Sequence, residues 1–297
     1  MSIFNYIINQ CQAGGTYSIS GDFEYFLNPG TGSIMVEATN ASGTYNQTIP
    51  GPFVDNVTNS YLITGIPSDG SPVSITVYFT DELVCDSIIT GTSPELPTVT
   101  NFTGAATYCA GDVIAPLFVD VTGTGPWTID FTVDGTPMSA TGTASPIDIG
   151  NLSGDYILTT VTDANCSHAA TGTQTIFVNA LPTVGSLTGG GIYCEGDPIN
   201  DIFANVTGAT PWTIDYTLNG VPAAYSDTVS PLNLGNGTGT YVITGITDAN
   251  CTTTASGTQT ILVNPLPLVS AGIDFTICEA DPAILTGSGA VTYVWDN

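Results

Sequence analysis

The sequence predicts an all-β chain in which β-sandwich domains follow one another. Three observations support this prediction. Residues that favour strands are plentiful, and Gly (34) and Pro (19) are numerous enough for many tight turns. No segment shows the 3.6-residue period of an amphipathic helix. Finally, the sequence repeats itself after 85 residues (126 to 211), a period that predicts tandem domains rather than a solenoid.

Two stretches carry the repeat most clearly. PWTIDFTVDG at 126–135 returns as PWTIDYTLNG at 211–220. Apolar and polar residues alternate in both copies, and the DG or NG that follows is a strong signal for a two-residue hairpin turn. TDANC at 162–166 returns at 247–251, and each copy then ends in a strand, QTIFVN or QTILVN. We expect five to seven strands in each repeat, with the tryptophan of each PW dipeptide packed into the core.

The repeat predicts four domains. Residues 97–181 and 182–266 are the two clear copies. Residues 1–96 form a divergent first domain, since 62–85 is similar to the later half of a repeat. Residues 267–297 begin a further, truncated copy, because about 30 residues cannot bury a sandwich core alone. Leu-Pro dipeptides at the boundaries restrict the chain locally, so we expect stiff joints and a rod of compact domains.

The charge of the chain excludes several functions. It has 26 acidic residues, no Lys and no Arg, and His168 is the only histidine, which gives a net charge of −26. Nucleic-acid binding requires cationic side chains, so it is excluded, and no lysine or arginine can bind a phosphate. No segment reaches the roughly 18–20 apolar residues that span a bilayer, so we expect no membrane insertion. Repulsion between acidic domains favours an extended array.

The seven cysteines predict disulfides. Pairing them in sequence order gives one bond in each domain: Cys11–Cys85, Cys109–Cys166 and Cys194–Cys251, with Cys278 left unpaired. Metal binding is the alternative, but the chain has no CxxC pair and almost no histidine. Disulfides persist in oxidising surroundings, so these pairs predict an extracellular protein.

Several motifs resemble those of a known family. YCAGD (108–112), YCEGD (193–197) and ICEAD (277–281), each followed 17–18 residues later by Trp, resemble Ig-like repeats of giant cell-surface proteins of Bacteroidota. Such modules occur there in long arrays in secreted adhesins, including gliding-motility adhesins exported by the type IX system. The resemblance implies Ig-like sandwiches at the cell surface. It covers 97–297 well and 1–96 weakly, and ICEAD departs from the pattern at Ala280, where the family has Gly.

Calcium is the one cofactor that the sequence suggests. Hard cations bind several oxygen ligands, and acidic residues recur in the predicted turns. The alternative is that these carboxylates cap the backbone of their own turns, which is common for Asp and is the interpretation that we favour. The candidate ligands are Asp112, Asp163, Asp197, Asp248 and Asp281.

Catalysis is not expected. A hydrolase triad would have to use His168, but the next repeat has Thr253 at that position, which indicates an incidental histidine. DSI at 86–88 and DTV at 227–229 resemble the O-glycosylation triplet of Bacteroidota proteins. This weaker resemblance predicts modification of Ser87 and Thr228 in turns.

The function that the sequence favours is structural. We expect a stalk or spacer segment of a long extracellular adhesin or surface filament, whose partners are further copies of the repeat or of the chain. One alternative is a self-assembling filament, in which the apolar strand at residues 2–10 completes the truncated domain of a neighbour. Another is a module in 1–96 that binds glycans or surfaces through a platform of aromatic side chains. The same side chains could instead form the core of that domain, which is the interpretation that we favour. The residues are Tyr17, Phe23, Tyr25, Phe26 and Tyr45.

Overall fold

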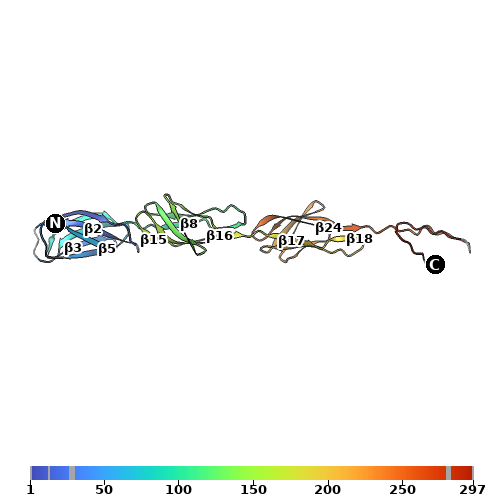
Figure 1. Cartoon of the computed structure of the whole chain (residues 1–297), viewed down its shortest axis with the longest axis horizontal. Coiled ribbons are helices and arrows are strands. Elements are labelled where there is room, and N and C mark those ends of the chain that lie inside the picture. The colour runs from blue at the N-terminus through green and yellow to red at the C-terminus, as the bar shows by residue number, and fades with distance from the viewer. Residues whose placement is uncertain (1, 13, 27–30, 279–281, 296–297) are drawn as a thin grey trace. The chain divides into compact units, whose positions relative to one another are not determined.

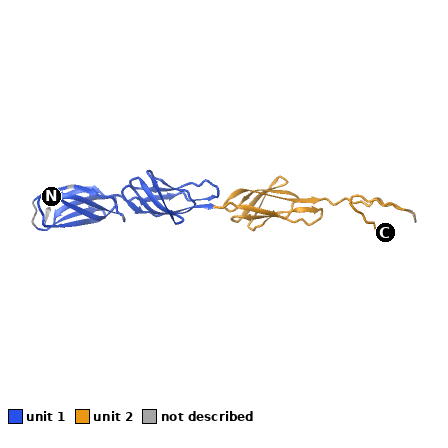
Figure 2. Ribbon diagram, in the orientation of Figure 1, with its two compact units in different colours: residues 1–178 blue, residues 179–297 orange. Residues whose placement is uncertain are grey.

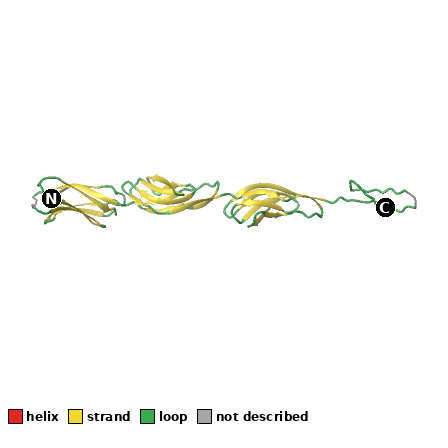
Figure 3. Cartoon of the chain, turned by 60° about the horizontal axis from the view of Figure 1, so that its bottom comes forward, coloured by secondary structure: helices red, strands yellow, loops and turns green. Residues whose placement is uncertain are grey.

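The computed structural model describes residues 2–12, 14–26, 31–278 and 282–295, apart from the side chains of residues 4 and 82–85. Every regular element within these ranges is a strand (Figure 3), which confirms the all-β prediction. No helix in the described ranges is long and apolar enough to cross a membrane. The chain forms two compact units, residues 1–178 and residues 179–297 (Figure 2).

The first sandwich of unit 1 has a three-stranded and a four-stranded sheet, with the strand orders β1-β2-β5 and β4-β3-β6-β7. Figure 1 labels β2, β3 and β5 of this sandwich. Side chains alternate between the core and solvent, as in β3. Both sheets contribute to one core that includes Tyr17, Phe23, Val36 and Ile75. The strands are β1 (Ser2–Ile8), β2 (Thr16–Glu24), β3 (Ser33–Asn40), β4 (Gly43–Pro50), β5 (Asn59–Pro67), β6 (Pro72–Phe79) and β7 (Glu82–Thr92).

The second sandwich of unit 1 repeats this plan. Its sheets have the orders β13-β10-β8 and β12-β11-β14-β16-β9, with β15 paired to β14. Leu117, Ile129, Tyr156 and Val161 lie in the core that the two sheets share. The strands are β8 (Val99–Thr103), β9 (Ala106–Cys109), β10 (Leu117–Val121), β11 (Trp127–Val133), β12 (Thr136–Gly142), β13 (Ile147–Gly150), β14 (Gly154–Thr162), β15 (Ser167–Ala169) and β16 (Thr173–Asn179).

Unit 2 contains the third sandwich, with the strand orders β17-β19-β22 and β18-β24-β23-β20-β21. Its core includes Ile202, Ile214, Leu232 and Tyr241. Two sheets over one core, repeated along the chain, define tandem Ig-like β-sandwich domains and confirm the predicted fold class. The strands are β17 (Thr183–Thr188), β18 (Gly191–Cys194), β19 (Ile202–Thr207), β20 (Trp212–Leu218), β21 (Val221–Asp227), β22 (Leu232–Gly235), β23 (Gly239–Thr247) and β24 (Thr252–Asn264).

The two predicted hairpins are present. β11 pairs with β12 and β20 pairs with β21, each through a two-residue turn. Asp134 and Gly135 have φ values of 48° and 79°, and Asn219 and Gly220 have 54° and 80°. Two consecutive residues with positive φ make the turn that matches the twist of the flanking strands, which explains the DG and NG of the repeat.

The two tryptophans of the PW dipeptides begin their strands as predicted. Trp127 starts β11 and Trp212 starts β20, and each half-buried ring packs against the core of its sandwich. The indole N–H of Trp127 donates to the carbonyl oxygen of Thr122 at 3.0 Å. Trp127 therefore fixes the start of β11 by a hydrogen bond and also packs against the core.

The described residues after 267 form no named strand and contain one isolated bridge, between Ser270 and Ser288. Their apolar side chains are exposed, with Leu268 at 91% and Val291 at 100%. The predicted boundaries at 97 and 182 fall between the residues of the three cores. The exact limits of the four predicted domains stay a prediction.

Candidate functional site

A disulfide connects the first two sandwiches of unit 1. Cys11, in the connection between β1 and β2, bonds to Cys166, between β14 and β15, with a Cα–Cα distance of 4.7 Å. Two hydrogen bonds lie beside it. The backbone N–H of Cys11 donates to the carbonyl oxygen of Asn165 at 3.2 Å, and the side-chain amide of Gln10 donates to that of Ala164 at 3.3 Å. The junction is therefore covalent and also hydrogen-bonded.

This bond overturns the predicted pairing. Since Cys11 bonds to Cys166, the pairs Cys11–Cys85 and Cys109–Cys166 are wrong. Cys194 carries a free, exposed thiol, so the pair Cys194–Cys251 is wrong too, and Cys278 is also free and exposed. Both Cys109 and Cys251 are disulfide-bonded. The side chain of Cys85 lies outside the described residues.

Strand length explains why pairing within one sandwich fails. In the parallel ladder of β18 and β24, Cys194 lies opposite Asn264, the last residue of β24. Cys251 directly precedes Thr252, the first residue of the same 13-residue strand. At about 3.3 Å per residue the two cysteines are roughly 40 Å apart, whereas a disulfide requires Cα atoms within about 7 Å. The two cysteines of one repeat thus lie at opposite ends of their sandwich.

The TDANC turn holds its cysteine through a buried aspartate. The Asp163 carboxylate is 8% exposed and accepts three backbone N–H bonds, from Thr124 at 2.8 Å, Asn165 at 2.8 Å and Cys166 at 2.7 Å. These bonds fix the loop that presents Cys166 to its partner. The sequence predicted this turn but not the disulfide that it presents.

The same arrangement recurs in unit 2. The Asp248 carboxylate accepts N–H bonds from Ala209 at 2.8 Å, Asn250 at 2.8 Å and Cys251 at 2.7 Å. Burial raises the pKa of this carboxyl. The three N–H donors together lower the pKa by more than burial raises it, so the pKa lies below the ordinary 3.8.

The depressed pKa of Asp248 predicts a loss of stability in acid. The carboxyl binds its proton at a higher pH in the unfolded chain than in the folded one, so its stabilisation is present above about pH 4 and is lost as the pH falls through the folded-state pKa. We expect the free energy of unfolding to decline below pH 4, and Asp248→Asn to make that decline shallower. Denaturant unfolding between pH 2 and pH 5 measures both slopes. Identical slopes would contradict this role.

Gly208 predicts a second effect on the same turn. Its φ is +123°, and an added Cβ would lie 2.5 Å from an Asp248 carboxylate oxygen and 3.0 Å from the Cβ of Pro182. We expect Gly208→Ala to lower the free energy of unfolding by about 2–3 kcal/mol, from backbone strain and from displacement of the carboxylate. Gly196→Ala is the matched control, because φ there is +93° but no atom lies within 4 Å of the added Cβ. Equal losses in the two variants would exclude the collision.

The calcium candidates serve as turn caps. Asp112 accepts the N–H of Cys109 and Asp197 accepts the N–H of Cys194, each at 2.8 Å. Asp163 and Asp248 accept the N–H bonds described above. Among the described residues, no group of three His, Cys, Asp or Glu side chains could hold a metal ion. Asp281 lies outside the described residues.

Removal of divalent cations is therefore expected to have no effect on stability. The four described carboxylates already accept N–H donors, so their turns do not depend on a cation. We expect the same melting temperature in EDTA and in millimolar calcium, by calorimetry. A lower melting temperature in EDTA would show that a cation stabilises the chain.

The aromatic platform proposed in 1–96 is wrong. Tyr17, Phe23 and Tyr25 are buried in the first core, and half-buried Tyr45 packs against that core. Phe26 is exposed at 56%. Alternation along strands turns these rings inward, as the second interpretation of the sequence expected.

The two predicted glycosylation residues and the single histidine lie at three separate places in the sandwiches. Ser87 is half-buried opposite Val77 inside β7, so the predicted turn at 86–88 is wrong. Thr228 is exposed in a turn after β21, where its N–H donates to the Asp227 carboxylate at 2.6 Å, and its glycosylation stays a prediction. His168 is exposed in β15, opposite Val161.

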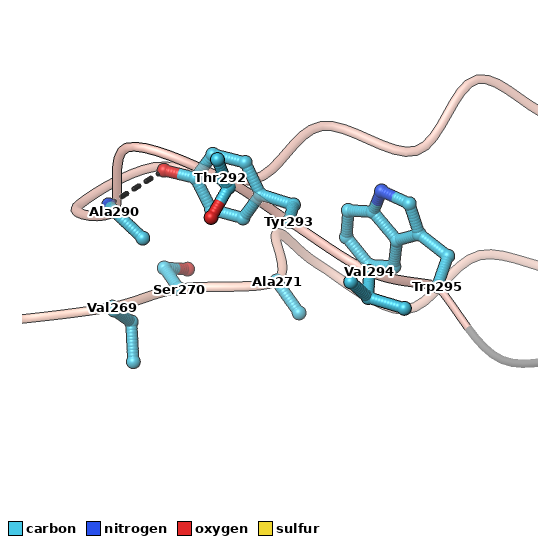
Figure 4. Close-up of a pocket in the computed structure, with 8 residues that line it drawn as sticks. All are labelled: Val269, Ser270, Ala271, Ala290, Thr292, Tyr293, Val294 and Trp295. Atoms are coloured by element: carbon cyan, nitrogen blue, oxygen red, sulfur yellow. Dashed lines mark hydrogen bonds between the residues drawn. The ribbon is translucent and has the colours of Figure 1, made fainter.

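A hollow of about 530 Å³ lies in the C-terminal segment (Figure 4). Among its lining residues, the hydroxyl oxygen of Tyr293 accepts the N–H of Ala290 at 2.7 Å, and the Tyr293 and Trp295 rings stack 6.5 Å apart. Among the described residues that line it, none is charged, and the polar side chains are the hydroxyls of Ser270, Thr292 and Tyr293 and the indole of Trp295.

The fold and the junction thus define a protein of tandem Ig-like sandwiches, two of which are covalently connected. No protein-family model and no curated protein matches the chain. Among solved structures it is similar to a Ca²⁺-stabilised adhesin with which an Antarctic bacterium binds ice (18% identity, 89% of this chain, 74% of that chain, TM-score 0.31). It is also similar to an I-band fragment of titin (12% identity, 89% and 99%, TM-score 0.43). At these identities the likeness concerns the fold alone.

Proposed function

We propose that the chain is a stalk or spacer segment of a long extracellular adhesin or surface filament, without catalytic activity. The observation that carries this proposal is the Cys11–Cys166 bond, which joins one sandwich to the next. A bond inside one domain stabilises only that domain. A bond between successive domains also carries load past the residues between Cys11 and Cys166, so that they need not extend under tension, which suits a stalk.

Two further features support the proposal. Disulfides persist outside the reducing cytosol, which supports an extracellular location. The chain has 26 acidic residues and no Lys or Arg, so its domains repel one another and resist aggregation. The resemblance of YCAGD and YCEGD to Ig-like repeats of secreted Bacteroidota adhesins, including those of gliding motility and type IX export, supports the same role.

The donor-strand alternative receives less support. β1, which contains most of the proposed donor segment at residues 2–10, already pairs with β2 of its own sandwich, from Ser2 opposite Glu24 to Ile8 opposite Ile19. A strand that completes its own domain is not spare for a neighbour.

Labelling of intact cells tests the location. An antibody raised against residues 97–266 is applied to intact and to permeabilised cells that produce the protein, followed by immunogold electron microscopy. We expect label on intact cells, at a distance from the envelope. Label in permeabilised cells alone would overturn the proposal.

Single-molecule pulling tests the mechanical role. With handles at the two ends, the bond between Cys11 and Cys166, which are 155 positions apart, removes most of the residues between them from the path that bears the load. We expect a reducing agent to add extended length on the order of several hundred Å, at about 3.6 Å per residue. The Cys11→Ser variant should show at least part of this extra length without reduction. If reduction adds no length, the bond bears no load.

A further inference from the structure

Cys194 lies at one end of the third sandwich, with its thiol exposed and free. Three backbone contacts fix its position. Its N–H donates to the Asp197 carboxylate at 2.8 Å, its carbonyl oxygen accepts the N–H of Asp197 at 3.0 Å, and the next residue, Glu195, donates to the carbonyl oxygen of Asn264 at 2.8 Å. Because Asn264 ends β24, this thiol lies where the sandwich ends and the chain continues.

The same position in the preceding repeat forms a disulfide. Cys109, 85 residues earlier, ends β9 and has the same turn: its N–H donates to Asp112 at 2.8 Å, and Asp112 donates back at 3.0 Å. β9 lies beside β16, the last strand of its sandwich, as β18 lies beside β24. Cys109 is disulfide-bonded.

The first sandwich shows which kind of cysteine is the partner. Cys11 follows β1, which lies against the end of β7, the last strand of that sandwich: the Tyr6 hydroxyl donates to the carbonyl oxygen of Thr90 at 3.0 Å. Cys11 bonds to Cys166, which the TDANC turn of the next sandwich presents. A cysteine beside the end of the last strand thus bonds to a cysteine at the near end of the next sandwich.

We propose that Cys194 is a covalent attachment site for the TDANC-type cysteine of a further repeat of the same kind. Residues 267–297 contain a single cysteine, Cys278 in ICEAD, which holds the same type of position as Cys194. Both TDANC cysteines of this chain, Cys166 and Cys251, are already disulfide-bonded, so the partner thiol belongs to a further copy of the repeat. This attachment goes beyond the stalk function, because it follows from the positions of the cysteines and not from cell-surface display.

The bond forms by a balanced oxidation. The Cys194 thiol and the partner thiol lose two protons and two electrons, and one S–S bond forms. A small disulfide such as oxidised glutathione accepts the electrons and is reduced to two thiols.

An extended chain tests the proposal in an array. Residues 267–297 are replaced by a second copy of residues 182–266, which carries one Thr-to-Ser change beside its TDANC cysteine so that its peptides differ in mass. After oxidation with glutathione, blocking of free thiols and pepsin digestion, we expect mass spectrometry to find Cys194 linked to the TDANC cysteine of the added copy. The counterpart of Cys194 in the added copy should stay blocked as a free thiol.

Two further arms complete the test. The same extended chain with Cys194→Ser should leave the added TDANC cysteine free. The unextended chain, oxidised in the same way, is examined on a non-reducing gel. Because Cys166 and Cys251 are already bonded, we expect no dimer through Cys194, and a dimer that is lost in Cys194→Ser would contradict the choice of partner. If Cys194 remains fully blocked in the extended chain, the proposal is overturned.

Discussion

Replacement of Cys11 by Ser is expected to lower the free energy of unfolding of the first sandwich by about 4 kcal/mol. The disulfide joins residues 155 positions apart and restricts the unfolded chain, and loops on the order of 100 residues give a stabilisation of this size. The variant also loses the disulfide that joins the first sandwich to the second, so we expect the two to unfold at different temperatures. Calorimetry of the full chain measures both effects.

Cys278→Ser is the matched control for this variant. Cys278 is free and exposed, so its replacement should leave the unfolding curve unchanged. Cys166→Ser should behave like Cys11→Ser, since it removes the same bond. If Cys11→Ser unfolds like the unaltered chain, the bond does not stabilise the junction.

Replacement of Asp163 by Ala is expected to cost about 3–5 kcal/mol, because it leaves three partly or fully buried N–H donors without an acceptor. These donors belong to Thr124, Asn165 and Cys166, so the loop that presents the cysteine should loosen. Asp163→Asn keeps one acceptor oxygen and should lose less. Denaturant unfolding measures the free energy of unfolding of each variant. The rate at which Cys166 is alkylated under mild reduction measures how accessible the loop has become.

Asp112→Ala provides the comparison. This carboxylate also accepts a backbone N–H, from Cys109, but it is exposed, so that water can replace it. We expect a loss of about 1 kcal/mol or less. Equal losses for Asp112→Ala and Asp163→Ala would mean that the burial of Asp163 contributes nothing.

The strands and their turns could be predicted from the sequence because their causes are local. The positive φ of Asp134 and Gly135 follows from the residues themselves, and so does the hairpin between β11 and β12. The alternation of apolar residues determines which side chains enter the core. The same rule decides between platform and core for Tyr17 and Phe23, once the strand that contains them is known.

The disulfide pairing could not be predicted, because it depends on where strands end in space. Sequence order places Cys194 and Cys251 in one repeat, 57 positions apart, and suggests a pair. Only the parallel pairing of β18 with the far end of β24 shows that they lie at opposite ends of the sandwich. The predicted turn at Ser87 fails for a similar reason, since β7 continues through it to Thr92.

The disulfide between Cys11 and Cys166 also closes a covalent ring that includes residues 11–166. Within this ring two routes of bonds connect the residues before Cys11 to the residues after Cys166, one through the backbone and one through sulfur. A protease that cuts the backbone once inside the ring opens it but releases no fragment. A second cut there can release only the segment between the two cuts, and the two ends of the chain separate only when the disulfide is also reduced. A filament built from such rings would survive single breaks that would divide an ordinary string of domains.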